Sequence, residues 1–274
     1  MAFKLFDYQS SGKGVSKSAP QKKPFFKYWE IFGRKFWKLI ELNMLYVLFC
    51  IPIITFGPAT AALTHVMRKF ILEQPCFVFD EFFTAFKKNF KQSVFIGIVD
   101  VIMIVSVWIA CFQFLMNESL PDGSLVFICI MICCATLVFI MHFYIYLEIV
   151  ALNLSIGSIL KNAVFLVFLG VKRNFIALII NLVIISLIVL FLPFSVFAVI
   201  FLPLSLMCFT TTFICYPVIQ KYIVNPYYEE RGERNPELGP ITEEDIAENA
   251  VFVDRGGSEK EIKAAPKAYG KVIK

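Results

Sequence analysis

Long apolar runs with few polar positions inside them dominate the pattern of this chain after residue 92. Each of four runs is long enough to form a membrane-spanning helix, and they cover residues 93–116, 124–147, 175–191 and 195–219. An α-helix rises 1.5 Å per residue, so about 20 residues cross roughly 30 Å of hydrocarbon. Short connections join the runs in pairs. The pattern therefore predicts two helical hairpins, at residues 93–147 and 174–220.

A shorter apolar stretch, residues 37–72, is interrupted near its centre. Pro52 has no backbone N–H and ends or kinks a helix. Residues 55–58 form a turn signal that ends in Pro58, a favourable residue at the start of a helix. Small residues follow, including Thr60, and small residues let helices approach closely in a bilayer. We predict that the stretch goes out and returns, either as two short spans or as a re-entrant hairpin. We favour two short spans, which give six transmembrane helices in three hairpins.

Amphipathic segments separate the hairpins. Residues 79–91 place phenylalanines on one helical face with lysines beside them, and residues 153–170 occupy the equivalent position before the last hairpin. Residues 25–38 mix aromatic and basic side chains, as interfacial helices do. Similar patterns precede each hairpin, which fits either an internal duplication or the need for basic residues before every outgoing helix. The predicted fold class is an all-α integral membrane protein with interfacial amphipathic helices.

Composition and charge agree with this class and indicate an orientation. Of the 274 residues, 58% are hydrophobic and 17% are charged, and the mean hydropathy of +0.73 is too high for a soluble domain. A basic tail, 1–24, predicted to be disordered, precedes the membrane domain, 25–222, and a polar tail, 223–274, follows it. Because basic segments face the cytoplasm, we predict a multi-pass protein of the cell membrane with both termini cytoplasmic. The lipid bilayer is the expected partner, and no nucleic acid is expected.

Motifs for catalysis or metal binding are missing from the sequence. It contains no phosphate-binding loop, no GxSxG and no HExxH. Its two histidines, His65 and His142, are expected to serve in helix packing and in an aromatic belt. We therefore predict no catalytic residue, no metal ligand and no cofactor, and we do not expect an enzyme.

Two acidic residues inside the apolar runs are more informative. Asp100 lies about seven residues into its run, roughly 10 Å deep, and neither Asp100 nor Glu148 has a basic residue four positions away. Such groups are costly in a bilayer and face a partner or a wet cavity. The functional interpretation is a proton or solute pathway, and the structural one is pairing with Arg68, Lys69, Lys161 or Arg173. The candidate polar cavity consists of Asn43, Pro52, Thr55, Gly57, Thr60, Asp100 and Glu148.

Three segments resemble the YesL family, a bacterial membrane family of unknown function. They are Leu-Ile-Glu-Leu-Asn at 39–43, the stretch 50–63 around Pro52, and Phe-Phe-Thr-Ala-Phe-Lys-Lys-Asn-Phe-Lys-Gln at 82–92. The resemblance extends loosely over residues 25–225. It implies an association with carbohydrate ABC transporters and polysaccharide-degradation loci by gene neighbourhood, and it brings no catalytic residues.

Two function classes follow from these observations. The first is an accessory or regulatory membrane protein that binds the permease subunits of an ABC transporter for carbohydrates. The second is a small secondary transporter with a polar site at the broken first hairpin, since transporters often contain broken helices. An intramembrane enzyme would need a nucleophile–base or metal arrangement that the sequence does not offer. The sequence does not indicate an oligomeric state.

Overall fold

The computed structural model describes residues 23–116, 124–233 and 235–238. These residues are helical almost throughout, and no strand occurs among them. The predicted all-α class is confirmed. The tail predicted at 1–24 lies outside the described residues except for its last two positions, and the tail predicted at 223–274 lies outside them after residue 238.

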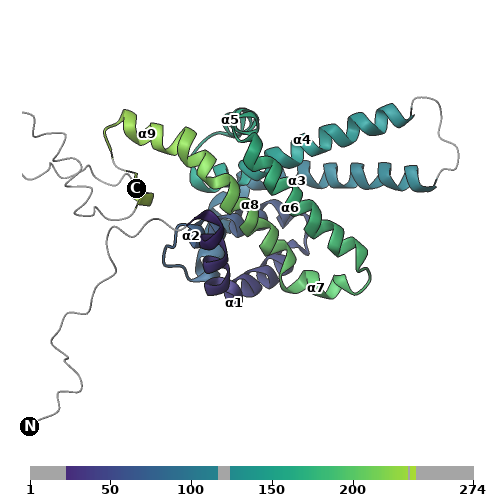
Figure 1. Cartoon of the computed structure of the whole chain (residues 1–274), viewed down its shortest axis with the longest axis horizontal. Coiled ribbons are helices and arrows are strands. Elements are labelled where there is room, and N and C mark those ends of the chain that lie inside the picture. The colour runs from purple at the N-terminus through teal and green to yellow at the C-terminus, as the bar shows by residue number, and fades with distance from the viewer. Residues whose placement is uncertain (1–22, 117–123, 234, 239–274) are drawn as a thin grey trace, which may run out of the picture. The chain divides into compact units, whose positions relative to one another are not determined.

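The described helices follow one another along the chain in the order shown in Figure 1. Their bounds are α1 (Pro24–Cys50), α2 (Phe56–Ile71), α3 (Val78–Met116), α4 (Ser124–Ala151), α5 (Ile156–Leu169), α6 (Val171–Leu190), α7 (Ser195–Phe201), α8 (Pro203–Ile219) and α9 (Asn225–Glu230). Shorter helical segments are η1 (Ile53–Thr55) and η3 (Pro236–Leu238), which are 3-10 helices, and η2 (Gln220–Val224), a π-helix.

Two compact units make up the chain, residues 1–36 and 37–274. In the first unit the described residues form the beginning of α1, where the ring of Trp29 meets those of Phe25 and Phe32 edge to face at 6.4 and 5.7 Å between centroids. This segment was predicted as an interfacial helix by itself. In the structure the same helix continues to Cys50, because no proline interrupts residues 25–50.

Four helical segments among the described residues are long and apolar enough to cross a membrane: Val78–Ala110, Leu125–Ala151, Val171–Leu190 and Pro203–Glu230. They overlap the four apolar runs predicted after residue 92 and indicate a membrane protein. The six predicted transmembrane helices are not confirmed, since neither arm of the hairpin 37–72 is among the four. One reason is length: α2 has 16 residues, fewer than the about 20 that span the hydrocarbon.

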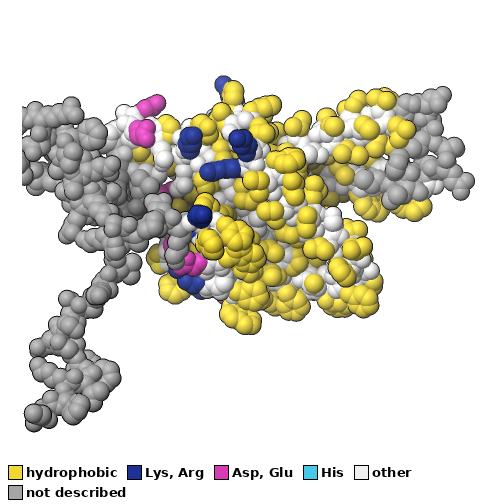
Figure 2. All heavy atoms as spheres, in the orientation of Figure 1, with side chains coloured by type: hydrophobic (Ala, Val, Ile, Leu, Met, Phe, Trp, Pro, Cys, Tyr) yellow, Lys and Arg dark blue, Asp and Glu magenta, His cyan; other side chains and the backbone are white. Residues whose placement is uncertain are grey.

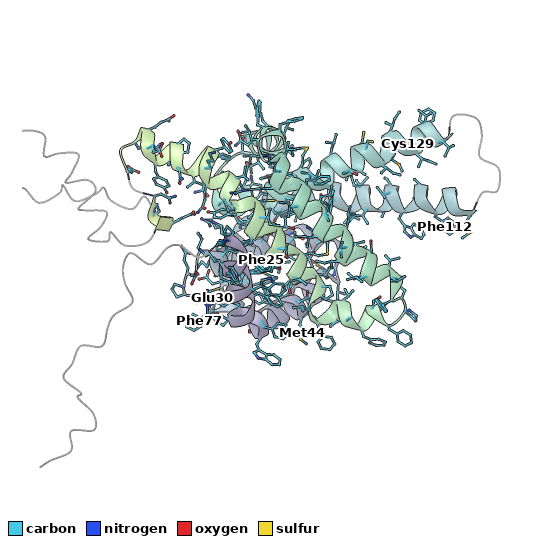
Figure 3. The ribbon with its side chains drawn as sticks, viewed as in Figure 1. Phe25, Glu30, Met44, Phe77, Phe112 and Cys129 are labelled. Atoms are coloured by element: carbon cyan, nitrogen blue, oxygen red, sulfur yellow. The ribbon has the colours of Figure 1, made fainter. Side chains whose placement is uncertain are left out.

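α3 joins two elements that were predicted separately. The amphipathic helix 79–91 and the first arm of the hairpin 93–147 form one helix of 39 residues, because no proline separates them. α3 and α4 run side by side (Figure 1). Phe112 and Cys129 project outward from these two helices (Figure 3) and are exposed. An apolar surface of this kind suits contact with lipid better than contact with water.

The last hairpin contains a break that the sequence interpretation missed. α6 ends at Leu190, and the chain turns around Pro193, in the short connection predicted between the apolar runs 175–191 and 195–219. The return arm consists of two helices, α7 and α8, which are separated at Leu202. Pro203 begins α8 and has no N–H to donate to the preceding turn. Carbonyl groups near the end of α7 therefore need other donors.

α2 packs against α3, α4 and α8 in the second unit, and its small side chains allow this close approach. Ala59, Ala61 and Ala62 are fully buried. Gly57 lies so near α3 that a Cβ on Gly97 would be 2.5 Å from the Gly57 Cα. Small residues at a helix crossing let the two backbones meet. Figure 2 shows apolar side chains over much of the visible surface of α6, α7 and α8, as expected of helices surrounded by lipid.

Candidate functional site

A pocket of about 150 Å³, here named the central pocket, lies among α1, α2, α4, α6 and α8. Its polar lining residues are Tyr46, Thr60, Thr64, His142, Tyr146, Asn181, Cys208, Thr211 and Thr212, and its apolar ones are Leu63, Phe139, Phe143, Leu147, Leu204 and Met207. Pockets that enclose drug-sized ligands measure roughly 300–1,000 Å³. The central pocket is smaller, and its size suits water molecules or a small polar solute.

Asp100 reaches the lining of the central pocket through two contacts. It lies on α3 and is buried. The Tyr146 hydroxyl donates a hydrogen bond to Asp100 Oδ2 at 2.7 Å, and His142 Nδ1 lies 3.2 Å from Oδ1. His142 and Tyr146 are four positions apart on α4, so they share one helical face. When Nδ1–H donates to the carboxylate, Nε2 of His142 is left as a proton acceptor. The three residues can therefore hold and transfer a proton beside the pocket.

Hydroxyl and amide groups of the lining bond to one another across helices. The Tyr46 hydroxyl lies 3.1 Å from Thr60 Oγ1, which joins α1 to α2. Asn181 of α6 donates to Thr211 Oγ1 of α8 at 2.9 Å. Within α2, Thr64 Oγ1 donates to the Thr60 backbone carbonyl at 2.8 Å. These bonds satisfy polar groups that would be costly to bury alone, and they make the centre of the bundle polar.

Asn43 closes the break between α7 and α8 instead of lining the pocket. Its side-chain amide donates to the carbonyls of Val199 and Ile200, each at 2.8 Å, and its Oδ1 accepts from the Ser205 N–H at 2.7 Å. Asn43 is fully buried. It therefore supplies both the donors and the acceptor that the broken helix lacks. This residue of the first hairpin has a structural role in the last one.

Pro52, Thr55 and Gly57 shape the turn of the first hairpin and lie outside the central pocket. Pro52 follows the end of α1, as predicted. Thr55 Oγ1 lies 2.6 Å from the carbonyl oxygens of Phe49 and Pro52, which caps the end of that helix. Gly57 makes the close approach to α3. Of the residues predicted in the turn and just after it, Thr60 lines the pocket.

Glu148 is buried and does not line the central pocket. Its side chain has no exposed surface, and neither carboxylate oxygen makes a hydrogen bond of normal geometry to any described residue. The Asn162 side chain of α5 lies beside it. A buried carboxyl group without good partners is destabilising. The structure thus places Asp100 beside the pocket and leaves Glu148 outside it.

Two of the four cations predicted to pair with the acids bind other carboxylates. Arg68 forms an ion pair with Glu237, and the Tyr216 hydroxyl accepts from Arg68 Nε at 2.7 Å and donates to the same carboxylate at 2.6 Å. Lys69 pairs with Glu81 at 2.5 Å. The prediction that Asp100 or Glu148 pairs with these two cations was wrong. Lys161 and Arg173, the other two predicted partners, form no ion pair in the described part of the chain.

The contact of Arg68 with Glu237, here named the C-terminal latch, ties η3 to α2. Gln220 adds a hydrogen bond to Glu237 at 3.0 Å. Burial raises the pKa of Glu237, but the Arg68 guanidinium and the hydrogen bonds from Tyr216 and Gln220 outweigh it and hold the pKa below its ordinary value. The latch is therefore strongest when Glu237 is ionised.

Sequence reasoning found Thr60 and Asp100 but missed most of the pocket. His142 was expected to serve in an aromatic belt, whereas it contacts Asp100. The sequence contained a signal for this contact. His142 and Tyr146 lie one turn apart on one helix, and the preceding helix carries Asp100, which has no basic residue four positions away. Asn181, a polar residue inside an apolar run, was a second signal.

The described part of the chain contains no clear metal-binding site. No group of three or more His, Cys, Asp or Glu side chains there is arranged to hold a metal ion. The central pocket offers hydroxyls, one imidazole and, behind it, one carboxylate. This donor set suits hydrogen bonding to a small polar molecule and proton transfer.

Comparison with known proteins finds one similarity. Residues 39–111 match a family that is described as "Protein of unknown function, DUF624". The matched region runs from the second half of α1 to most of α3 and includes Asn43, Thr60 and Asp100. Neither the curated proteins nor the solved structures contain a match. The chain is thus similar to that family over its first three helices.

Proposed function

We propose that this chain is a YesL-like accessory membrane protein of carbohydrate uptake, which binds the permease subunits of an ABC transporter. The match over residues 39–111 includes the motifs on which the resemblance to YesL rests, and that resemblance implies the link with sugar transporters. One structural observation supports an accessory role. The central pocket, at about 150 Å³, is smaller than the roughly 300–1,000 Å³ typical of pockets for drug-sized ligands. The small volume of the central pocket is consistent with a role in which a partner protein transports the sugar.

The proposed arrangement places the protein in the cell membrane with both termini cytoplasmic. In this arrangement the four candidate spans pair as two hairpins, and α1 and α2 form a re-entrant hairpin that turns at residues 51–55. Single thiols introduced into a cysteine-free variant test this orientation. A thiol at Asn117 should react with a membrane-impermeant reagent from outside, and one at Ser258 should react after permeabilisation. The reverse labelling would refute the arrangement.

Co-purification tests the accessory role. The tagged full-length chain, extracted from its native membranes in mild detergent, should carry permease subunits in stoichiometric amounts, which mass spectrometry identifies. An unrelated tagged membrane protein extracted in the same way serves as the control and should not carry them. Recovery of the chain alone from cells that are actively taking up carbohydrate would contradict the proposal.

A small secondary transporter is the second candidate, and one observation favours it. The ionisable pair Asp100 and His142 adjoins a polar pocket among helices that contain breaks, an arrangement that suits coupling to protons. Purified chain in proteoliposomes should then take up a small polar solute when a pH gradient is applied. Asp100→Asn should abolish that uptake, whereas Glu148→Gln, at a residue that does not line the pocket, should leave it unchanged. A purified chain that moves no solute would exclude this candidate without affecting the co-purification test.

A further inference from the structure

A second pocket, of about 310 Å³, lies where the beginning of α6 meets the end of α8. Its charged lining residues are Lys172 and Arg173, from the first turn of α6, and Lys221, just after α8. The remaining lining consists of Leu169, Gly170, Val171, Pro217, Val218 and Tyr222, so no acid is among the described residues that surround it. We name it the basic pocket.

The cations of the basic pocket lack neutralising partners among residues 23–116, 124–233 and 235–238. None of the three takes part in an ion pair there, and all three are exposed. Lys221 Nζ lies 5.1 Å from the centre of the Tyr222 ring. Figure 2 shows Lys and Arg side chains gathered over the region where α5, α6 and the end of α8 meet. Three like charges around one hollow repel one another, and a bound anion relieves that repulsion.

The position of the basic pocket relative to the membrane indicates which kind of anion it binds. α6, which is one candidate span, begins at Val171. α8 is the apolar part of the candidate span Pro203–Glu230, and it ends at Ile219. The cations therefore lie where two spans leave the hydrocarbon, at the level of phospholipid headgroups. Basic pockets between transmembrane helices at this level are suited to anionic headgroups.

Apolar side chains beside the cations distinguish a lipid from a free anion. Leu169 and Val171, which line the basic pocket, are 52% and 58% exposed, and Phe168 next to them is 69% exposed. Burial of such surface under an acyl chain is favourable by roughly 25 cal/mol per Å² relative to water. A free phosphate ion would contact the cations and leave this apolar surface uncovered.

We propose that the basic pocket binds the phosphate of an anionic phospholipid, with its acyl chains against Phe168, Leu169 and Val171. Lys172, Arg173 and Lys221 supply the charge, and the first-turn amides of α6 add to the positive potential. This site is separate from the central pocket and does not depend on the function proposed for the chain.

Binding of defined lipids to the full-length chain tests the proposal. The detergent-purified chain is titrated with phosphatidylglycerol, with phosphatidylcholine and with inorganic phosphate, and native mass spectrometry and thermal unfolding report binding. The pocket variant is Lys172→Gln, Arg173→Gln and Lys221→Gln combined. Its matched control removes three exposed lysines of α3, by Lys87→Gln, Lys88→Gln and Lys91→Gln combined.

We expect the chain to retain phosphatidylglycerol in preference to phosphatidylcholine and to unfold at a higher temperature with it. The pocket variant should lose affinity for phosphatidylglycerol by roughly fivefold per cation removed, and the lysine control should keep it. Equal losses in both variants would show that net charge alone attracts the lipid, and would overturn the proposal. Equal stabilisation by inorganic phosphate would overturn the assignment to a lipid. If the pocket variant does not fold, Arg173→Gln alone is compared with Lys87→Gln, with the same criteria.

Discussion

Replacing Gly97 by alanine tests the crossing of α2 and α3. A Cβ on Gly97 would be 2.5 Å from both the Cα and the N of Gly57, and a Cβ on Gly57 would be 2.9 Å from the Gly97 Cα. Carbon atoms in ordinary contact are about 3.5–4.0 Å apart. The atoms in conflict belong to the backbone, so no change of side-chain rotamer removes the overlap. The two helices must move apart.

The size of the effect follows from two opposing contributions. Overpacking a closely packed contact costs roughly 1–3 kcal/mol, and the rigid backbone on both sides places Gly97→Ala at the upper end of that range. Alanine recovers up to about 1 kcal/mol through its higher helix propensity. We therefore expect the free energy of unfolding to fall by about 2 kcal/mol, the difference between these two values.

Denaturant titration of the purified protein in detergent, followed by tryptophan fluorescence, measures this loss. Gly157→Ala is the matched control, because Gly157 lies in α5 and a Cβ there would meet nothing within 4 Å. The control should be as stable as the parent chain or slightly more stable. A Gly97→Ala variant whose stability equals that of the control would refute the close crossing of α2 and α3.

Three further changes probe single polar groups, each read by the same unfolding measurement. Asn43→Ala leaves the buried Ser205 N–H without its acceptor and should cost roughly 1–3 kcal/mol; an unchanged stability would mean that the break between α7 and α8 needs no cap. Glu237→Gln removes the anion that pairs with Arg68. Because the folded pKa of Glu237 is depressed, its stabilisation is complete above the ordinary glutamate pKa of about 4.3 and is lost as the pH falls through the lower folded value. The difference in the free energy of unfolding between parent and variant should therefore shrink on acidification. A difference that grows would contradict the latch. Glu148→Gln should leave stability unchanged or raise it, since the carboxyl makes no good hydrogen bond to the described residues; a large loss would show that its charge is paired.

Much of the candidate site lay beyond sequence reasoning for a common physical reason. Asn43 was expected to share a polar cavity with Asp100 and Glu148, yet it bonds to Val199, which is 156 positions away. Local sequence shows that a buried amide needs partners but does not identify them. The contact between His142 and Asp100 could not be identified from local sequence either, because it depends on how α3 and α4 are rotated about their axes. That rotation is set by packing of many apolar side chains that are nearly interchangeable in sequence.

The sequence by itself determined the helical class, the apolar segments that can cross a membrane, and the turns at Pro52 and Pro193. These features depend on segment length, apolar content and the missing proline donor, which are properties of neighbouring residues. Tertiary structure decided which polar groups meet: Asn43 with the broken last hairpin, Asp100 with His142, and Arg68 with the carboxylate of η3. A buried polar group bonds to whichever partner the packed helices bring within reach, and that distance exists only in the folded chain.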